Sequence, residues 1–461
     1  MNHVVMIGGS DAGISAALRV REIDPGIDVT VVVADRFPNF SICGLPFYLS
    51  GEVPDWHQLA HRTAEGLERE GIHLLLEHRA ESIDPQHKTV TIEDPGGIRT
   101  SLKYDKLIMC TGAVSVQPKI KGMDLAGVFF LRWMGDSFAL RRYLDEKKPA
   151  SAVIIGGGYI GMEMVDAFTF RGMNVTVIEY AETVMTTLDP ELGKRVEQAL
   201  RHHGVHVVTR TPVTSIEQNG TTLRVSGGDD FRADADVVLV AAGARPNSGL
   251  AASAGMQIGD FGAIRVNRRM ETSIADLYAA GDCAETWNRM TGEYGYMPLG
   301  TTAHKQGRVA GENAAGAHSE YQGSLGTQVV KIFDRVAART GLRDVEAKAA
   351  GFDPLTVEFE CWDHKEYYPG AKKLTLRVTG DRSSKRLLGI QIIGPHDAEI
   401  SKRVDIIATA IFNGMKMGEI SDLDLSYTPP FGSPWDPLQM ATQEWTRNEP
   451  QSRPAESDLS G

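Results

Sequence analysis

Residues 151–164 read SAVIIGGGYIGMEM, and their pattern is the strongest indication of the fold in this sequence. Its first five residues suit a short buried strand, the three glycines suit a tight turn, and the residues after them suit a helix. A second apolar run, NVTVIE, then ends at Glu179. A strand, a glycine turn, a helix and a strand that ends in an acid form the βαβ dinucleotide-binding unit, in which the backbone approaches a pyrophosphate at the helix N-terminus.

The spacing within this unit is complete. Gly156, Gly158 and Gly161 stand in GxGxxG register, and Glu179 lies 21 residues after Gly158. A carboxylate there binds the ribose hydroxyls of NADH and repels the 2′-phosphate of NADPH. Tyr180 follows in place of an arginine, so we expect NADH, with NADPH as the less favoured coenzyme.

The same pattern occurs at the start of the chain. HVVMIGGSDAG precedes a helical stretch, and DVTVVVAD ends at Asp35. This copy keeps Gly8 and Gly13 but has Ser10 at the middle glycine position. Two such units in one chain predict two nucleotide sites, as in an electron carrier that is supplied by a nicotinamide.

Composition excludes several classes of protein. The chain has 461 residues and a net charge of −12, which disfavours nucleic acid and anionic membranes as partners. Its four cysteines show no metal-ligand or CxxC spacing, so we expect no metal site. The apolar run at the N-terminus is too short for a signal sequence, and we expect a cytoplasmic protein without membrane spans.

The fold class we predict is α/β, with two Rossmann-like dinucleotide-binding domains followed by an α+β domain. Alternating β-branched segments begin near residue 325, a helical stretch covers 401–415, and a polar tail closes the chain. The expected divisions are 1–113 and 246–324 for the first nucleotide domain, 114–245 for the second, 325–446 for the α+β domain and 447–461 for a disordered tail.

Several spaced motifs resemble the flavoprotein disulfide reductases, specifically the single-cysteine branch with coenzyme A disulfide reductase, NADH oxidase, NADH peroxidase and persulfide reductases. Besides the glycine turns, they are Thr111-Gly112, AGARPN around Gly243, AGD ending at Asp282, and HKQGRVAGEN from His304. The resemblance implies FAD at the first turn, with Asp35 on its adenosine ribose and Asp282 on its ribityl chain. It implies NADH at the second turn, with Tyr159 covering the flavin and Glu163 as a polar contact.

The redox cysteine of that family is matched by Cys43 in NFSICGLPFY, residues 39–48. A cysteine between a loop and a helix start should have a lowered pKa because of the helix dipole. Dithiol relatives carry a second cysteine five positions on, where this chain has Tyr48. The second sulfur or oxygen must therefore come from outside, as a mixed disulfide, a persulfide or a sulfenic acid.

Two features favour disulfide or persulfide reduction over the other branches. Peroxidase and oxidase members carry a histidine beside the first glycine turn, where this chain has Asp11, and LPFY resembles the LPYY of the coenzyme A and persulfide reductases. The alternatives are an NADH oxidase or peroxidase that uses a Cys43 sulfenic acid, a flavin monooxygenase of a thiol-reactive species, and a slow redox-sensing flavoprotein.

The C-terminal domain resembles the family's dimerisation domain, which implies a homodimer whose partner subunit completes the active site. Tyr427 stands at the aromatic position that coenzyme A disulfide reductases use, and Tyr367 and Tyr368 are a second candidate pair. A phenol can donate a proton or hydrogen bond to a leaving thiolate. The expected substrate is a small thiol or disulfide, and its binding is assigned to Arg19, Arg21, Ser41 and Arg62.

Overall fold

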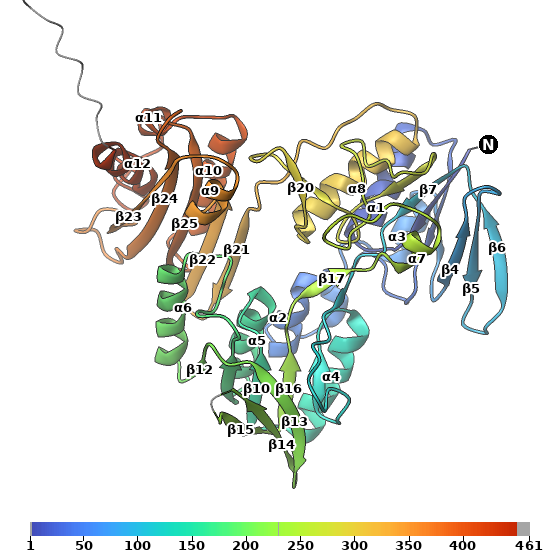
Figure 1. Cartoon of the computed structure of the whole chain (residues 1–461), viewed down its shortest axis with the longest axis horizontal. Helices are drawn as coiled ribbons and strands as arrows, with labels where there is room; N and C mark the ends of the chain where they lie inside the picture. Colours follow the sequence, from blue (N-terminus) through green and yellow to red (C-terminus); the bar gives the residue numbers. More distant parts are fainter. Residues whose placement is uncertain (1, 229, 450–461) are drawn as a thin grey trace, which may run out of the picture. The chain divides into compact units, whose positions relative to one another are not determined.

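The computed structural model describes residues 2–228 and 230–449, and the chain divides into two compact units. The first unit comprises Met1–Val184, Gly204–Asn288 and Gly292–Ser324. The second comprises Met185–His203, Arg289–Thr291 and Leu325–Gly461. Figure 1 shows the chain coloured along its sequence.

The first unit contains the N-terminal parallel sheet that the opening glycine turn predicts. Its strand order is β18-β7-β1-β2-β3, with bounds Leu277–Ala279, Lys106–Met109, His3–Ile7, Asp28–Val32 and Ile72–Leu75. Helices α1 (Asp11–Ile23) and α8 (Gly300–Ala314) lie side by side in this part (Figure 1). They approach closely because α8 has glycines at the contact: a Cβ atom on Gly307 would lie 2.2 Å from the Ala12 carbonyl oxygen.

A second five-stranded parallel sheet belongs to the same unit. Its strand order is β12-β11-β10-β16-β9, with bounds His206–Val208, Asn174–Ile178, Ser151–Ile155, Val237–Val240 and Val128–Phe130. Helices α4 (Met134–Lys147) and α5 (Tyr159–Phe170) pack against strands of this sheet. The strands β10 and β16 are almost entirely buried, as parallel strands covered on both faces require.

Smaller elements complete the first unit. Two antiparallel sheets consist of β4, β5 and β6 (Arg79–Asp84, Thr89–Glu93, Arg99–Lys103) and of β13, β14 and β15 (Val213–Asn219, Thr222–Gly227, Arg232–Ala235). Two strand pairs are β8 with β17 (Ala113–Ser115, Ala244–Pro246) and β19 with β20 (Thr286–Asn288, Glu293–Gly295). The short helices are α2 (Leu45–Ser50), α3 (Ala64–Arg69), α7 (Gly249–Ser253) and two 3₁₀ turns (Ile42–Gly44, Trp56–Leu59).

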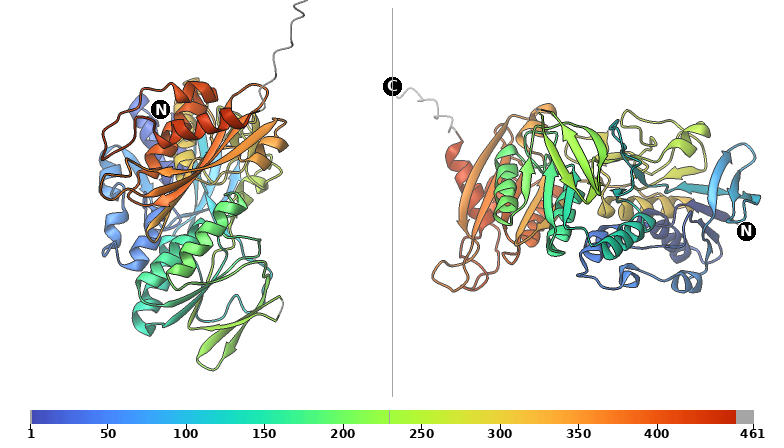
Figure 2. Two further views of the ribbon diagram at one scale, coloured as in Figure 1. Left: turned by 90° about the vertical axis from the view of Figure 1, so that its left-hand side faces the viewer. Right: turned by 90° about the horizontal axis from the view of Figure 1, so that it is seen from below.

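The second unit is built on an antiparallel sheet in the order β21-β22-β25-β24-β23. These strands are Gln328–Ile332, Arg335–Gly341, Leu387–Pro395, Lys373–Asp381 and Pro354–Trp362. Its C-terminal helices are α9 (Asp344–Ala349), α10 (Ile400–Phe412), α11 (Met417–Ser421) and α12 (Pro437–Asn448). Helix α10 packs on β22 and β25, and α12 packs on β23 and β24 (Figure 2).

Residues 447 and 448, which the sequence assigns to a tail, belong to a helix in the structure. Helix α12 continues through Arg447 to Asn448, because Trp445 in its last turn is buried and donates its indole N–H to the Leu355 carbonyl at 2.8 Å. Residues 450–461, which carry the rest of the predicted tail, lie outside the described residues.

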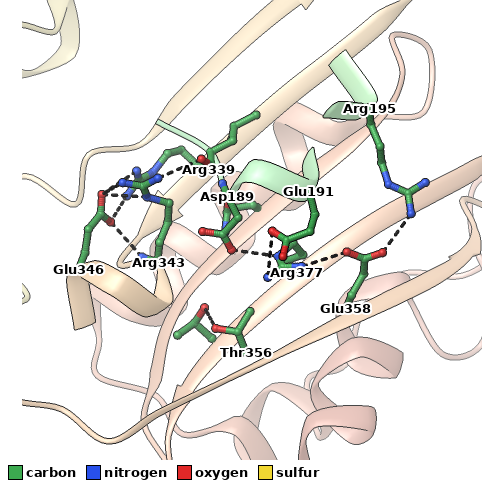
Figure 3. Close-up of polar contacts among 12 residues, drawn as sticks. Asp189, Glu191, Arg195, Arg339, Arg343, Glu346, Thr356, Glu358 and Arg377 are labelled. Atoms are coloured by element: carbon green, nitrogen blue, oxygen red, sulfur yellow. Dashed lines mark hydrogen bonds and ion pairs between the residues drawn. The ribbon is translucent and has the colours of Figure 1, made fainter. Parts of the chain in front are cut away.

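Helix α6 (Pro190–His202) packs within the second unit and is held there by a polar cluster, drawn in Figure 3. The buried Asp189 carboxylate accepts from Arg377 Nε at 2.9 Å and from Gln391 Nε2 at 2.8 Å. Arg339, also buried, donates to the Thr187 carbonyl at 2.7 Å. We call Asp189, Arg377 and Gln391 the α6 clamp.

Two absences bear on the expectations from sequence. Within residues 2–228 and 230–449, no helix is long and apolar enough to cross a membrane. In that same part of the chain, no group of three or more histidine, cysteine, aspartate or glutamate side chains is arranged to hold a metal ion.

Candidate active site

The loop that carries Cys43 is fastened to the first glycine turn by its backbone. Cys43 lies in the 3₁₀ turn Ile42–Gly44, directly before α2. Asn39 has φ of 57° and donates its N–H to the Gly9 carbonyl at 2.8 Å, and the Ser41 N–H donates to Leu59 at 2.8 Å. The thiol is therefore placed by the same backbone that forms the predicted nucleotide cradle.

Cys43 is exposed, but its surroundings do not lower its pKa as the sequence suggests. Although the residue as a whole is open to solvent, the protein packed around its sulfur raises the pKa of the thiol by desolvation. The negative charges of Glu163 and Asp11 raise this pKa further, while Arg132 lowers it. These two acids come from segments far from Cys43 in the sequence, so the position of the thiol before a helix does not reveal them. Around this thiol, burial and carboxylates outweigh the favourable dipole.

Glu163 is the carboxylate with the larger effect on Cys43. It lies in α5, the helix that follows the second glycine turn, and burial raises its pKa from 4.5 to about 7. A carboxyl group with such a pKa can hold or release a proton near neutral pH. Groups from both predicted nucleotide-binding units therefore act on the same sulfur.

Asp11, the first residue of α1, is approached by histidines from elsewhere in the chain. His304 Nε2 lies 3.5 Å from its carboxylate, and His304 Nδ1 lies 2.8 Å from the Ser15 hydroxyl. The rings of His61 and His304 are 6.4 Å apart. Burial raises the pKa of Asp11, while the two histidines lower it. The imidazole that the first glycine turn lacks in the sequence is thus supplied from α8.

Asp282, expected at the flavin ribityl chain, is paired with an arginine that the sequence analysis did not single out. Arg132 Nη2 lies 2.5 Å from its carboxylate, and the Tyr296 hydroxyl donates to its carbonyl at 3.1 Å. Arg132 is also the cation that lowers the pKa of Cys43. No motif marks Arg132 in the sequence, since it lies in a loop between β9 and α4.

The first glycine turn has the geometry that a dinucleotide needs. Gly8 has φ of +118°, and a Cβ atom there would lie 2.0 Å from the Cys110 carbonyl oxygen. Ser10 caps α1 without a side-chain hydrogen bond, which leaves the helix N-terminus available to an anion. Three residues after the end of β2, the Asp35 carboxylate accepts from the Phe37 N–H at 2.8 Å. These residues fit the pyrophosphate and ribose of FAD.

Other predicted flavin residues lie where the chain passes between the two parallel sheets. The Thr111 hydroxyl donates to the Asn247 carbonyl at 2.6 Å, and β8 pairs with β17 just beyond it. Gly112 and Gly243 both have positive φ, at 67° and 102°. The pairing of β8 with β17 holds the two connecting segments next to each other.

The second glycine turn leaves a clear space for a ligand. Nothing lies within 4 Å of a Cβ atom built on Gly158, whereas the same atom on Gly161 would lie 2.1 Å from the Gly156 carbonyl. Glu179 Oε2 accepts from the Gly157 N–H at 2.6 Å, so the acid lies against the turn. Tyr159 opens α5, and Tyr180 is 77% exposed. The turn fits a nicotinamide dinucleotide.

Within the described residues, no disulfide joins Cys43 to another cysteine. All four cysteines are free; Cys110 and Cys283 are buried, and Cys361 belongs to the second unit. Tyr48, at the position of the missing cysteine, is buried with its ring 5.0 Å from the Arg141 guanidinium.

The candidate substrate residues differ in what they already bind. Arg21 donates to the carbonyls of Pro25, Ile27 and Glu70, which is a structural role. Arg19 forms ion pairs with Glu22 and Glu312, both at 2.7 Å. Ser41 is partly exposed beside Cys43, and Arg62 is exposed.

The three candidate tyrosines lie in the second unit and project to solvent. Their exposed fractions are 44% for Tyr427, 74% for Tyr367 and 40% for Tyr368. Phe431 and Trp435, near Tyr427, are also exposed, at 70% and 52%. Tyr368 contacts the His364 ring at 5.8 Å.

Two glycine turns with the geometry of dinucleotide-binding units lie on two parallel sheets of the first unit, and groups from both dinucleotide-binding units act on one exposed thiol; these are features of a pyridine nucleotide-dependent oxidoreductase. The chain belongs to the pyridine nucleotide-disulphide oxidoreductases: this family matches residues 2–307, and its dimerisation domain matches residues 327–436. The expected family and fold class are thereby confirmed.

Individual relatives cover nearly the whole chain. The NAD(P)H sulfur oxidoreductase (CoA-dependent) of Pyrococcus furiosus is 38% identical over 94% of this chain and 97% of its own. An NADH oxidase of Methanocaldococcus jannaschii is 31% identical over 96% of this chain and 98% of its own. The structure of an NAD-dependent persulfide reductase from A. fulgidus superposes with a TM-score of 0.93, at 37% identity, over 96% of this chain and 83% of that one.

Proposed function

We propose that this protein is a homodimeric, NADH-preferring, FAD-dependent reductase of a low-molecular-weight disulfide or persulfide, such as coenzyme A disulfide. The observation that supports the proposal most strongly is the exposed, free thiol of Cys43, whose loop is hydrogen-bonded to the first glycine turn, while the other cysteines of the described chain are buried or only partly exposed. The similarity to a CoA-dependent sulfur reductase and a persulfide reductase supports the same chemistry.

In the first step, the Cys43 thiolate attacks one sulfur of the substrate disulfide. A new sulfur–sulfur bond forms to Cys43, the substrate bond breaks, and one thiolate leaves. A neighbouring acid can supply the proton that this thiolate takes up. Glu163, with a pKa of about 7, and the pair of Asp11 with His304 are the groups placed to do so.

In the second step, two electrons from NADH break the mixed disulfide and restore the Cys43 thiolate and a second free thiol. Bound FAD would supply the two-electron transfer from the nicotinamide hydride to the sulfur. Arg132 carries positive charge next to Cys43 and therefore stabilises the thiolate form. Glu179 would accept hydrogen bonds from the NADH ribose, and Gly158 leaves room for the pyrophosphate.

The second unit would contribute its exposed tyrosines to the active site of the partner subunit. Tyr427, Tyr367 and Tyr368 present phenols to solvent, where they can donate a hydrogen bond to the substrate sulfur. The match to the dimerisation domain supports this assignment.

The experiment compares Cys43→Ser with Cys361→Ser as a matched control. Cys43→Ser should stay yellow, and NADH should still reduce its flavin, but it should not turn over coenzyme A disulfide. Cys361→Ser should retain all three properties. Full disulfide turnover by Cys43→Ser would overturn the proposal.

One observation favours a second candidate, an NADH oxidase. The sequence argues against this branch because Asp11 replaces a histidine, yet the structure brings His304 to 3.5 Å from that carboxylate. An imidazole there can protonate a reduced oxygen species. Oxygen consumption with NADH alone, at a rate comparable to disulfide turnover and lost in His304→Ala, would favour the oxidase.

A further inference from the structure

The second unit contains two exposed segments that carry aromatic residues. In each, hydrogen bonds to a buried polar side chain hold the two ends of the segment together. The first, the Tyr367 loop, comprises residues 363–372 between β23 and β24. The second, the Tyr427 segment, comprises residues 422–436 between α11 and α12.

The Tyr367 loop is closed by Asp363. This residue is 6% exposed, its N–H donates to the Lys372 carbonyl at 2.9 Å, and its carboxylate accepts from the Lys372 N–H at 2.8 Å. The carboxylate also accepts from the His364 N–H at 2.9 Å. Both ends of the loop therefore meet at one buried side chain, while Tyr367 and Tyr368 lie near its exposed tip.

The Tyr427 segment is closed in a similar way by Gln439. Its amide nitrogen donates to the carbonyls of Ser421 and Leu423, at 3.0 and 2.7 Å, and its amide oxygen accepts from the Asp436 N–H at 3.1 Å. Gln439 is 4% exposed. Asp436, at the end of this segment, also caps α12 by accepting from the Leu438 N–H.

Arg403 of α10 contacts the hydrogen-bonded ends of both segments. Only 5% exposed, it donates to the Asp363 carbonyl at 2.7 Å and to the Ala398 carbonyl, and its Nε lies 3.5 Å from the Asp436 carboxylate. One buried guanidinium thus touches the base of both aromatic segments. A buried charge is costly unless it is paired, and this guanidinium is paired through two backbone carbonyls and the nearby Asp436 carboxylate, although its Nε forms no hydrogen bond within the described residues.

We propose that Arg403 is a positioning residue that couples the Tyr367 loop to the Tyr427 segment, so that both aromatic segments meet the substrate as one unit. The inference rests on the proposed function, in which these tyrosines serve the partner's active site. It adds that the relative placement of the two segments is set by Arg403 and Asp436.

The variants are Arg403→Met, which keeps the length of the side chain, Arg403→Lys, and Asp436→Asn, which retains a capping side chain for α12. Arg382→Met is the matched control, because Arg382 is a more exposed arginine of the same unit, paired with Asp353. The assays on the flavin-loaded protein are flavin reduction by NADH alone, and KM and kcat for coenzyme A disulfide. Thermal unfolding identifies variants that fail to fold.

Arg403→Met and Asp436→Asn should raise KM for coenzyme A disulfide at least tenfold, with flavin reduction by NADH within twofold of the native rate. Arg403→Lys should recover part of the loss. Tyr427→Phe should cost less in the Arg403→Met background than in the native one, because the segment is already misplaced.

Folded variants with the KM of Arg382→Met, or strict additivity with Tyr427→Phe, would overturn the inference. Should Arg403→Met fail to fold, Asp436→Asn alone decides, by the same KM comparison. Failure of the proposed function itself is distinct, since the native protein and Arg382→Met would then also show no disulfide turnover.

Discussion

Replacing Glu163 with glutamine tests the electrostatics around Cys43 most quantitatively. Burial raises the pKa of Glu163 from 4.5 to about 7, a difference that corresponds to about 3 kcal/mol against the ionised form in the folded protein. Because the folded state binds this proton more tightly than the unfolded state, stability is lost as pH rises from about 4.5 through about 7. Glutamine cannot ionise and removes this loss.

The stability of Glu163→Gln relative to the native protein should therefore increase by about 3 kcal/mol between pH 4.5 and pH 8. Urea unfolding of the flavin-free protein at several pH values measures this difference. Because only its change with pH is compared, any effect of the amide on stability that does not depend on pH drops out. Asp166→Asn, on the same helix, controls for the loss of one negative charge.

The same variant should also lower the pKa of the Cys43 thiol, because the ionised Glu163 raises it. The pH dependence of the rate of Cys43 alkylation by iodoacetamide measures this pKa. A stability difference that does not change with pH, or an alkylation profile identical to that of the native protein, would show that Glu163 does not have a raised pKa or does not act on Cys43.

Three further changes test other parts of the structure. Gly158→Ala should unfold at the native temperature but raise KM for NADH at least tenfold, because the added Cβ atom meets no protein atom within 4 Å and would enter the space for the ligand. Gly161→Ala should lower the melting temperature, because its Cβ atom would collide with the Gly156 carbonyl. Asp189→Ala should destabilise the protein by about 3 kcal/mol in denaturant unfolding, since it leaves Arg377 and its partners in the α6 clamp without their buried carboxylate. Arg21→Ala should lower stability without changing KM for the disulfide, because its guanidinium binds backbone carbonyls; a raised KM at native stability would place it in the substrate site instead.

The fold was predictable because its main signals are local. Each glycine turn lies between a strand and a helix in the sequence, and both parallel sheets form around those strands, with Val4 to Ile7 and Ala152 to Ile155 buried as expected. In the second unit, however, β22 has the sequence RVAARTG, whose two arginines and alanines hide the strand pattern. Arg339 in that strand is buried because it binds carbonyls near α6, a contact that no local pattern reveals.

The thiol was predictable from its motif, but its environment was not. Arg132 and Glu163 act on Cys43 from two separate segments, and His304 from a third pairs with Asp11, which also acts on this thiol; only Glu163 has a role that the sequence predicts. His304 lies in a quoted motif, so its presence was visible although its pairing with Asp11 was not. A pKa depends on all surrounding charges and on burial, and these follow from tertiary structure.

The central claim is that Cys43 forms and releases the mixed disulfide during turnover. The most direct measurement is the mass of the Cys43 peptide after incubation with coenzyme A disulfide, first without NADH and then with it. We expect a coenzyme A adduct on Cys43 after the first incubation and its loss after the second. Disulfide turnover with no adduct on Cys43 at any stage, or an adduct that NADH leaves in place, would contradict it.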